Sequence, residues 1–141
     1  MGLNFHPKQG TIVLVRFDGA FKEPEMVKPR LCVVISKPMK ARPALCTVVP
    51  LSTTVPLRIM PYHCELDVPF DLPDRWGRKR RWVKGDMVYS AGFHRVDLLL
   101  LGKDRSGKRI YQTKTLDKED LKLVQASVLH GLALSDLTKH L

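Results

Sequence analysis

The feature of this sequence that most constrains its fold is a pair of short β-branched runs at residues 31–35 and 45–51. Runs of this length and composition are typical of buried β-strands. The basic segment between them, residues 37–43, contains two prolines and predicts a turn. If the two strands pair in antiparallel orientation, the start of the first lies beside the end of the second.

Polar side chains mark the two strand ends that this pairing brings together. Arg30 opens the first strand, and three hydroxyl residues, Ser52, Thr53 and Thr54, close the second. A guanidinium group donates two parallel hydrogen bonds to phosphate oxygens, and neighbouring hydroxyls suit the same ligand. The sequence therefore predicts a phosphate-binding site at one rim of the sheet.

The rest of the chain predicts a mainly β protein whose helix comes last. Prolines recur too often between residues 56 and 73 for a helix there. A Gly-Asp pair at 85–86 predicts a bulge or bend, and the segment 93–101 is compatible with either helix or strand. Further short strands are expected at four places: 11–17, 62–68, 82–89 and 109–113.

The C-terminal segment has the three- and four-residue spacing of an amphipathic helix. Asp117 is a candidate N-cap, and the predicted apolar face consists of Leu121, Val124, Val128, Leu129 and Leu132. We therefore expect one domain over residues 1–141, a small, mostly antiparallel β-barrel with a C-terminal helix.

The charge of the chain favours a polyanionic partner. Lys and Arg number 24 against 14 acidic residues, which gives a formal net charge of +10. A surplus of this size suits nucleic acid or an anionic membrane surface, although a generically basic protein would share it. No apolar run is long enough to span a bilayer and the N-terminus lacks an export signal, so we expect a cytoplasmic protein without a membrane role.

The most basic stretch, residues 75–82, combines cations with tryptophans. Arginines bind phosphates while aromatic rings stack on unpaired bases, a combination expected of single-strand binding. The alternative is a solvated charged loop with one tryptophan in the core. The candidate RNA-binding residues are Lys28 on the first strand end and Arg75, Trp76, Arg78, Lys79, Arg80, Arg81 and Trp82 in this stretch.

The cysteines and histidines predict neither a metal site nor a cofactor. Cys32, Cys46 and Cys64 are widely spaced, and we expect buried, reduced thiols. His63 and His94 lack the spacing of a metal pair and are expected to be structural or exposed. Of the two, His94 is the better candidate for proton transfer, because the pKa of an unperturbed histidine lies near neutrality.

Three segments in order resemble the MazF/PemK family of toxin endoribonucleases. They are GTIVLV at residues 10–15, KPRLCVVIS at 28–36 and VVPLSTT at 48–54. The chain departs from the family pattern at Thr11, where an acid usually follows the first glycine. It departs again at Lys28, because Lys-Pro-Arg-Leu stands where Arg-Pro-Val is commoner. Either Arg30 or Lys28 can therefore occupy the place of the family's arginine.

The resemblance implies a small SH3-like barrel that forms a homodimer and cleaves single-stranded RNA, such as mRNA, without a metal. The 2′-hydroxyl of the RNA is the nucleophile, and an antitoxin protein silences the enzyme. Arg30 matches the family's transition-state arginine, Ser52 or Thr53 matches its threonine at the end of the third strand, and Glu23 or Glu25 matches an acidic loop position. A carboxylate with an ordinary pKa is a poor acid at neutral pH, so positioning by hydrogen bonds suits that position better.

Two other classes of function remain open from the sequence. One is a non-catalytic barrel module that binds RNA or DNA without cutting it. The other is an interaction protein whose charge serves solubility or docking.

Overall fold

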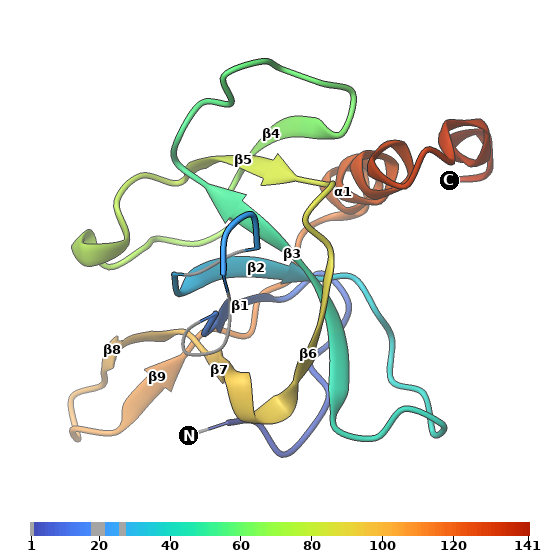
Figure 1. Cartoon of the computed structure of the whole chain (residues 1–141). Helices are drawn as coiled ribbons and strands as arrows, with labels where there is room; N and C mark the ends of the chain where they lie inside the picture. Colours follow the sequence, from blue (N-terminus) through green and yellow to red (C-terminus); the bar gives the residue numbers. More distant parts are fainter. Residues whose placement is uncertain (1, 18–21, 26–27) are drawn as a thin grey trace.

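The computed structural model describes residues 2–17, 22–25 and 28–141 (Figure 1). The long connection between the first two strands is therefore described only in part. In chain order the strands are β1 (Ile12–Val15), β2 (Arg30–Val34), β3 (Leu45–Ser52), β4 (His63–Asp67), β5 (Arg80–Lys84), β6 (Tyr89–Gly92), β7 (Val96–Leu98), β8 (Leu100–Lys103) and β9 (Arg109–Tyr111). The helical segments are α1 (Lys118–Gly131) and three 3-10 turns, η1 (Asp74–Trp76), η2 (Phe93–Arg95) and η3 (Ser135–His140).

One antiparallel sheet contains seven of these strands in the order β4-β5-β3-β2-β1-β7, with β6 added beside β3. β3 organises it, because β2 pairs along one of its edges while β6 and then β5 pair along the other. The predicted antiparallel pairing of the two β-branched runs is confirmed, with Val33 opposite Val49. β8 and β9 form a separate two-stranded sheet.

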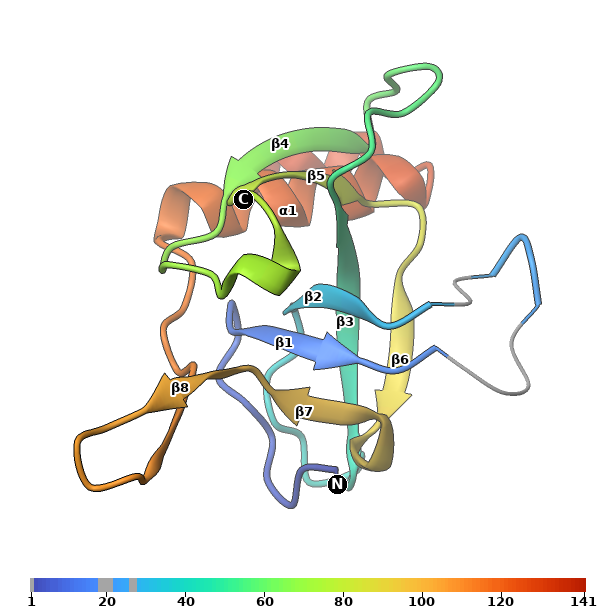
Figure 2. The same ribbon diagram turned by 90° about the vertical axis from the view of Figure 1, so that its left-hand side faces the viewer.

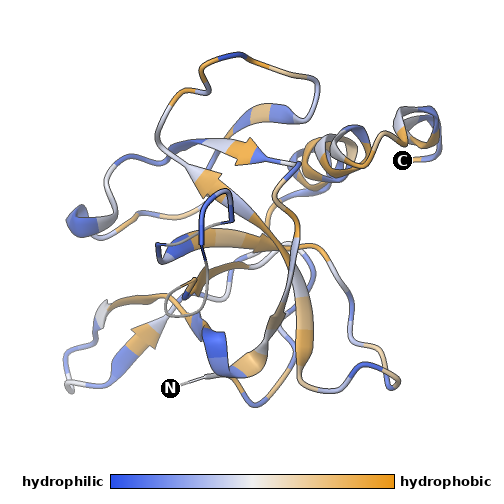
Figure 3. Ribbon diagram, viewed as in Figure 1, coloured by the Kyte–Doolittle hydropathy of each residue, from blue (hydrophilic) through white to orange (hydrophobic). Residues whose placement is uncertain are grey.

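Alternating side chains of the central strands fill two cores on opposite faces of the sheet. The ribbon of these strands is coloured mainly as hydrophobic (Figure 3). On β2, Leu31 and Val33 enter the core that β4, β5 and α1 cover, whereas Cys32 and Val34 enter the other. Burial on both faces explains why these strands are continuous apolar runs rather than alternating ones. The central strands are therefore a fixed frame for the residues at their ends.

The helix begins as the sequence predicts and then differs at its end. The Asp117 carboxylate accepts a hydrogen bond of 2.8 Å from the Asp120 backbone N–H, which caps the first turn. Val124 and Val128 are buried as expected, but Leu132 is 56% exposed. The reason is that α1 ends at Gly131, so Leu132 no longer continues its apolar face.

The predicted fold class is confirmed, with the difference that the antiparallel sheet formed by the described residues does not close into a complete barrel. The sheet is mainly antiparallel and followed by a helix, as predicted, but within the described residues no ladder joins its end strands β4 and β7. The single strand expected over 82–89 is also wrong, because β5 ends at Lys84 and β6 begins at Tyr89, with a bend at the predicted Gly85-Asp86 position. The ambiguous segment 93–101 contains η2 and β7 rather than an α-helix. No described helix is long and apolar enough to cross a membrane.

Candidate functional site: a charged pocket at the end of β2

Arg30 and Ser52 lie on one face of the sheet at neighbouring strand ends. Cys32 pairs with Pro50, so the same register continued by two residues places Arg30 opposite Ser52. Side chains two residues apart on a strand share a face. The ladder between β2 and β3 itself ends at the Cys32–Pro50 pair, so the contact of Arg30 with the hydroxyl residues stays a prediction.

β5 and β4 extend this face with residues from their alternate positions. Ser52 is opposite Trp82, and Lys84 follows Trp82 by two residues on β5. Lys84 is in turn opposite His63 on β4. Cations from β2 and β5 and an imidazole from β4 thus occupy one face of the sheet.

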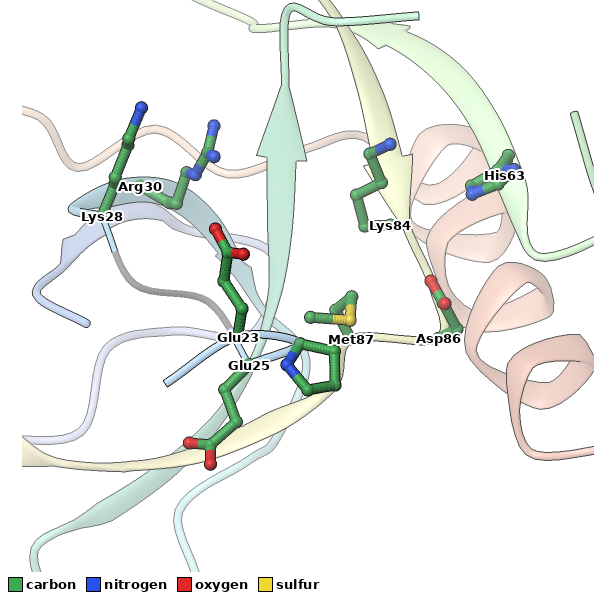
Figure 4. Close-up of a pocket in the computed structure, with 9 residues that line it drawn as sticks. Glu23, Glu25, Lys28, Arg30, His63, Lys84, Asp86 and Met87 are labelled. Carbon is green, nitrogen blue, oxygen red and sulfur yellow. The ribbon is translucent and has the colours of Figure 1, made fainter. Parts of the chain in front are cut away.

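These residues surround a surface pocket of about 730 Å³ (Figure 4). Three cations and three acids line it together with a histidine, and its charge is therefore nearly balanced. The lining residues are Glu23, Pro24, Glu25, Lys28, Arg30, His63, Lys84, Asp86 and Met87.

Arg30 has an unsatisfied donor at this pocket. Its Nε is buried and has no hydrogen-bond partner among the described residues. Leaving a buried charged donor unpaired costs free energy, and a bound anion would remove that cost. Lys28 lines the same pocket from the same strand end, so both basic candidates from the sequence are present.

The two candidate loop acids point in different directions. In Figure 4 the Glu23 carboxylate is directed toward the side of the pocket that holds Arg30, whereas the Glu25 carboxylate points away from the cations. Both residues line the pocket. The structure thus brings Glu23 closer to the predicted chemistry than Glu25.

The hydroxyl residues after β3 are held by local hydrogen bonds. Ser52 is 5% exposed, and its Oγ accepts a bond of 3.1 Å from the Thr54 N–H, which leaves its own O–H free to donate. The Thr53 carbonyl accepts a bond of 3.1 Å from Arg78 Nη2. Neither Ser52 nor Thr53 is one of the described residues that line the pocket.

His63 and Lys84 are pocket residues that sequence reasoning missed. Nδ1 of His63 accepts a hydrogen bond of 3.0 Å from the Met60 N–H, so in the neutral ring the proton is on Nε2. Burial and the neighbouring Lys84 charge lower the pKa of His63, while Asp86 opposes the shift. The sequence feature that could have indicated Lys84 is the alternation of Arg80, Trp82 and Lys84, which places these three side chains on one face of β5. His94, the other histidine considered, lies in η2 and does not line this described pocket.

The basic stretch 75–82 divides into side chains with different surroundings. Arg80 forms ion pairs with Glu65 at 2.8 Å and Asp67 at 3.6 Å, and Lys79 pairs with Asp71 at 2.7 Å. Both cations are therefore partly neutralised by neighbours on the same surface.

Arg81 is buried, with 6% exposure, unlike the other cations of this stretch. Its guanidinium donates to the backbone carbonyls of Arg78 at 3.0 Å and of Trp76. Because these bonds hold the turn before β5, Arg81 is a structural residue here rather than an exposed contact. The Arg75 guanidinium lies 5.7 Å from the centre of the Trp76 ring, and Trp76 packs against the core.

The three thiols are free. Burial raises the pKa of Cys46 to about 11 and also raises that of Cys32 and Cys64. Protonated thiols are weak nucleophiles, so they do not compete with the pocket as a reactive site. Among the described residues no group of three or more His, Cys, Asp or Glu side chains is arranged to hold a metal ion.

Comparison with known proteins identifies the family. Residues 8–131 match the family model described as PemK-like, MazF-like toxin of type II toxin-antitoxin systems. This match extends over most of the chain, and the chain therefore belongs to that family. Comparison with curated protein sequences gives no match.

Solved structures share the fold at low sequence identity. An endoribonuclease from a mycobacterial species, in complex with its cognate antitoxin, has a TM-score of 0.56 at 15% identity, covering 92% of this chain and 97% of its own. MazF from Deinococcus radiodurans has a TM-score of 0.55 at 18% identity, with coverages of 92% and 98%. A MazE-MazF structure from the same organism gives 0.53 at 19% identity, with coverages of 93% and 99%. At these identities the likeness concerns the fold alone.

Proposed function

We propose that this toxin is an endoribonuclease that cuts single-stranded RNA without a metal ion. The observation that carries the proposal is the buried Nε of Arg30, which has no hydrogen-bond partner among the described residues, at a pocket that also contains Lys84. A phosphodiester bound there would satisfy this donor and would lie between cations from two different strands. The family membership and the endoribonucleases among the structural neighbours support the same activity.

In the proposed reaction the 2′-hydroxyl oxygen of the RNA attacks the adjacent phosphorus. The hydroxyl loses its proton, the bond from phosphorus to the 5′-oxygen breaks, and the leaving oxygen takes up a proton. The products are a 2′,3′-cyclic phosphate and a 5′-hydroxyl end. Arg30 stabilises the negative charge that develops on the phosphoryl oxygens, because its donors are already in place and need little reorganisation.

The other pocket residues have supporting roles in this proposal. Glu23 accepts a hydrogen bond from the 2′-hydroxyl and orients it, as its direction in Figure 4 allows. Lys84 binds a second phosphoryl oxygen or the next phosphate, and Nε2–H of His63 donates to the substrate. The Ser52 hydroxyl, which is on the same face of the sheet as Arg30, is a further hydrogen-bond donor, and Thr53 is the alternative hydroxyl residue.

The proposed partners follow from the same family. An acidic antitoxin segment would bind the cations of the pocket and block RNA, and the complexes of structural neighbours with antitoxins support such a partner. We further propose that the toxin is a homodimer in the cytoplasm, where mRNA is available. Sedimentation at increasing protein concentration tests the dimer, and a monomer at all concentrations would contradict it.

The activity is tested by incubating the purified protein with single-stranded RNA in excess EDTA and analysing the ends of the products. We expect cleavage that EDTA does not inhibit and fragments with 2′,3′-cyclic phosphate and 5′-hydroxyl ends. Intact RNA with a folded protein would contradict the enzyme, and retained binding in that case would identify a non-catalytic RNA-binding module. Addition of the cognate antitoxin should abolish cleavage.

A further inference from the structure

The β8–β9 hairpin stands apart from the main sheet. It projects from the body of the molecule in both ribbon views (Figures 1 and 2). β1 pairs Val15 with both Arg30 and Val96, and it pairs Val13 with Leu98. The hairpin follows Leu98, so it extends from the end of the strands opposite to Arg30.

Hydrogen bonds stabilise the hairpin at its base and at its tip. At the base, the Gln112 N–H donates to the carbonyl of the buried Leu99 at 2.8 Å, and Gln112 itself is 1% exposed. At the tip, Asp104 Oδ1 accepts hydrogen bonds from the Ser106 N–H, the Ser106 hydroxyl and the Lys108 N–H at 2.7–3.0 Å. The Asp104 carboxylate therefore builds the turn, and it forms no ion pair with any described residue.

Four cations of the hairpin are exposed: Lys103, Arg105, Lys108 and Arg109. None forms an ion pair within the described chain. Lys103 is directly opposite Arg109 in the register of the two strands. Like charges at opposite positions destabilise a strand pair, so this arrangement does not serve the stability of the hairpin. An external polyanion would turn the repulsion into attraction.

Exposed aromatic rings lie beside these cations. A hollow of about 660 Å³ between the hairpin and the N-terminal segment is lined by Phe5, Arg109 and Tyr111, among others. Phe5 is 50% exposed and Tyr111 is 42% exposed. Half-exposed rings next to a guanidinium are suited to stacking unpaired bases while the cation binds their phosphates.

Basic residues connect the hairpin with the pocket at Arg30. Arg75 and Gly102, from segments far apart in the sequence, line one hollow of about 250 Å³ at the base of β8. Three residues after Arg75, Arg78 donates to the Thr53 carbonyl, immediately after Ser52. Two exposed guanidinium groups, Arg78 and Arg75, therefore lie between the end of β3 and the base of the hairpin.

We propose that the β8–β9 hairpin, with Phe5 and Tyr111, is a second binding site for single-stranded RNA, continuous with the cleavage pocket through Arg78 and Arg75. The proposal deepens the proposed function and rests on it for the identity of the RNA as substrate. The hairpin binds RNA that extends beyond the scissile phosphate and so favours long transcripts over short oligonucleotides. Acidic proteins and duplex DNA share the attraction to cations, but neither needs exposed rings for stacking.

The test compares two charge-matched quadruple variants of the full chain. The hairpin variant carries Lys103→Gln, Arg105→Gln, Lys108→Gln and Arg109→Gln, and the control carries Lys37→Gln, Lys40→Gln, Lys118→Gln and Lys122→Gln at other exposed positions. A third variant is Tyr111→Ala. Cleavage is measured on the shortest oligonucleotide that the wild type cuts and on the same site extended on both sides. RNA binding is measured separately in the Arg30→Ala background, with thermal unfolding as the check on folding.

We expect the hairpin variant to raise KM for the extended RNA while leaving kcat, and both constants for the short oligonucleotide, unchanged. Its log–log salt slope for binding should flatten by about 0.7 for each phosphate that the variant no longer neutralises. Tyr111→Ala should weaken binding of the extended RNA roughly 5- to 100-fold. The control should show neither the length-dependent KM change nor the weakening expected for Tyr111→Ala.

Equal KM values for the hairpin variant and the control on extended RNA would overturn the proposal. A hairpin-dependent affinity for duplex DNA or for an acidic polypeptide, without one for single-stranded RNA, would overturn it as well. If the wild type does not cut RNA but the hairpin variant still loses binding in the Arg30→Ala background, the proposed function fails and the RNA-binding site stands.

Discussion

Neighbouring arginines on β5 have opposite roles because side chains alternate along a strand. Arg80 is on the outer face with Glu65 and Asp67, whereas Arg81 is directed inward and donates to two backbone carbonyls. The composition of the stretch alone predicts that both arginines bind RNA. Burial separates a surface cation from a structural one.

Arg81→Ser should lower the free energy of unfolding by about 2 kcal/mol, since it removes two charge-assisted hydrogen bonds. Arg80→Ser should change stability little, because its ion pairs are exposed. Urea unfolding of the two variants measures the difference. Equal stabilities would show that the carbonyl bonds of Arg81 contribute nothing to the fold.

His63 is predicted to remain neutral at physiological pH. Its pKa should lie below the ordinary value of 6.5, because burial and Lys84 disfavour the cation. The unfolded chain then binds the proton more tightly, so this residue lowers stability as the pH falls from 6.5 toward the folded-state pKa. NMR titration of His63 should show a higher pKa in Lys84→Met and a lower one in Asp86→Asn, each compared with the wild type. An unchanged titration in both variants would rule out the proposed electrostatic coupling.

The residues of the site were predictable to different degrees. The antiparallel pairing of the two strands that carry Arg30 and Ser52 could be predicted from sequence, because two β-branched runs are joined by a short turn. Lys84 and His63 were not found, because their placement depends on the pairing of β4 with β5, which no local pattern specifies. For the same reason, the separate surroundings of Arg80 and Arg81 were not predicted.

At the scale of elements, the close contact between α1 and the end of β5 fixes one wall of the pocket. A Cβ built on Gly85 would lie 2.4 Å from the Ser127 carbonyl oxygen and 2.7 Å from that of Tyr62. Both are backbone atoms, which cannot move as a flexible side chain would. The glycine therefore allows α1 to pack against the β4–β5 pair, beside the pocket residues Lys84 and Asp86.

Gly85→Ala should destabilise the protein by about 2 kcal/mol through this overpacking. Because Lys84 and Asp86 flank the substitution, the cleavage rate should fall by more than the unfolded fraction explains. Urea unfolding and single-turnover cleavage measure the two effects, with the exposed helix substitution Lys122→Ala as the control. A fully stable and active Gly85→Ala protein would show that α1 can shift without affecting the pocket.

The boundaries of β5, β6 and α1 were predicted from the sequence only in part. The Gly85-Asp86 bend was identified, but the strand was predicted to continue through it, because Val83 to Tyr89 has strand-like composition on both sides. The helix cap at Asp117 was correct since capping is local. Leu132 was assigned to the buried face by periodicity alone, which does not show where the helix ends.

At the scale of the whole molecule, the fold class was predictable and the closure of the sheet was not. Short strands punctuated by prolines and one late helix indicate a mainly antiparallel protein. Closure depends on whether end strands meet, and within the described residues β4 and β7 do not pair. The net charge of +10 favoured a polyanion. The structure shows that the pocket is nearly balanced in charge, whereas the β8–β9 hairpin carries four exposed cations.

The most direct test of the central claim is the single-turnover rate of RNA cleavage by Arg30→Ala, measured beside Arg80→Ala with both proteins shown to be folded. Arg30→Ala should reduce the rate about 100-fold or more, the usual effect of removing a preorganised donor to developing negative charge. Arg80→Ala should remain within a few-fold of the wild type, since this cation is paired with Glu65 and Asp67. A folded Arg30→Ala protein that cleaves at the wild-type rate would contradict the account, and a loss found only in Lys28→Ala would transfer the role to that lysine.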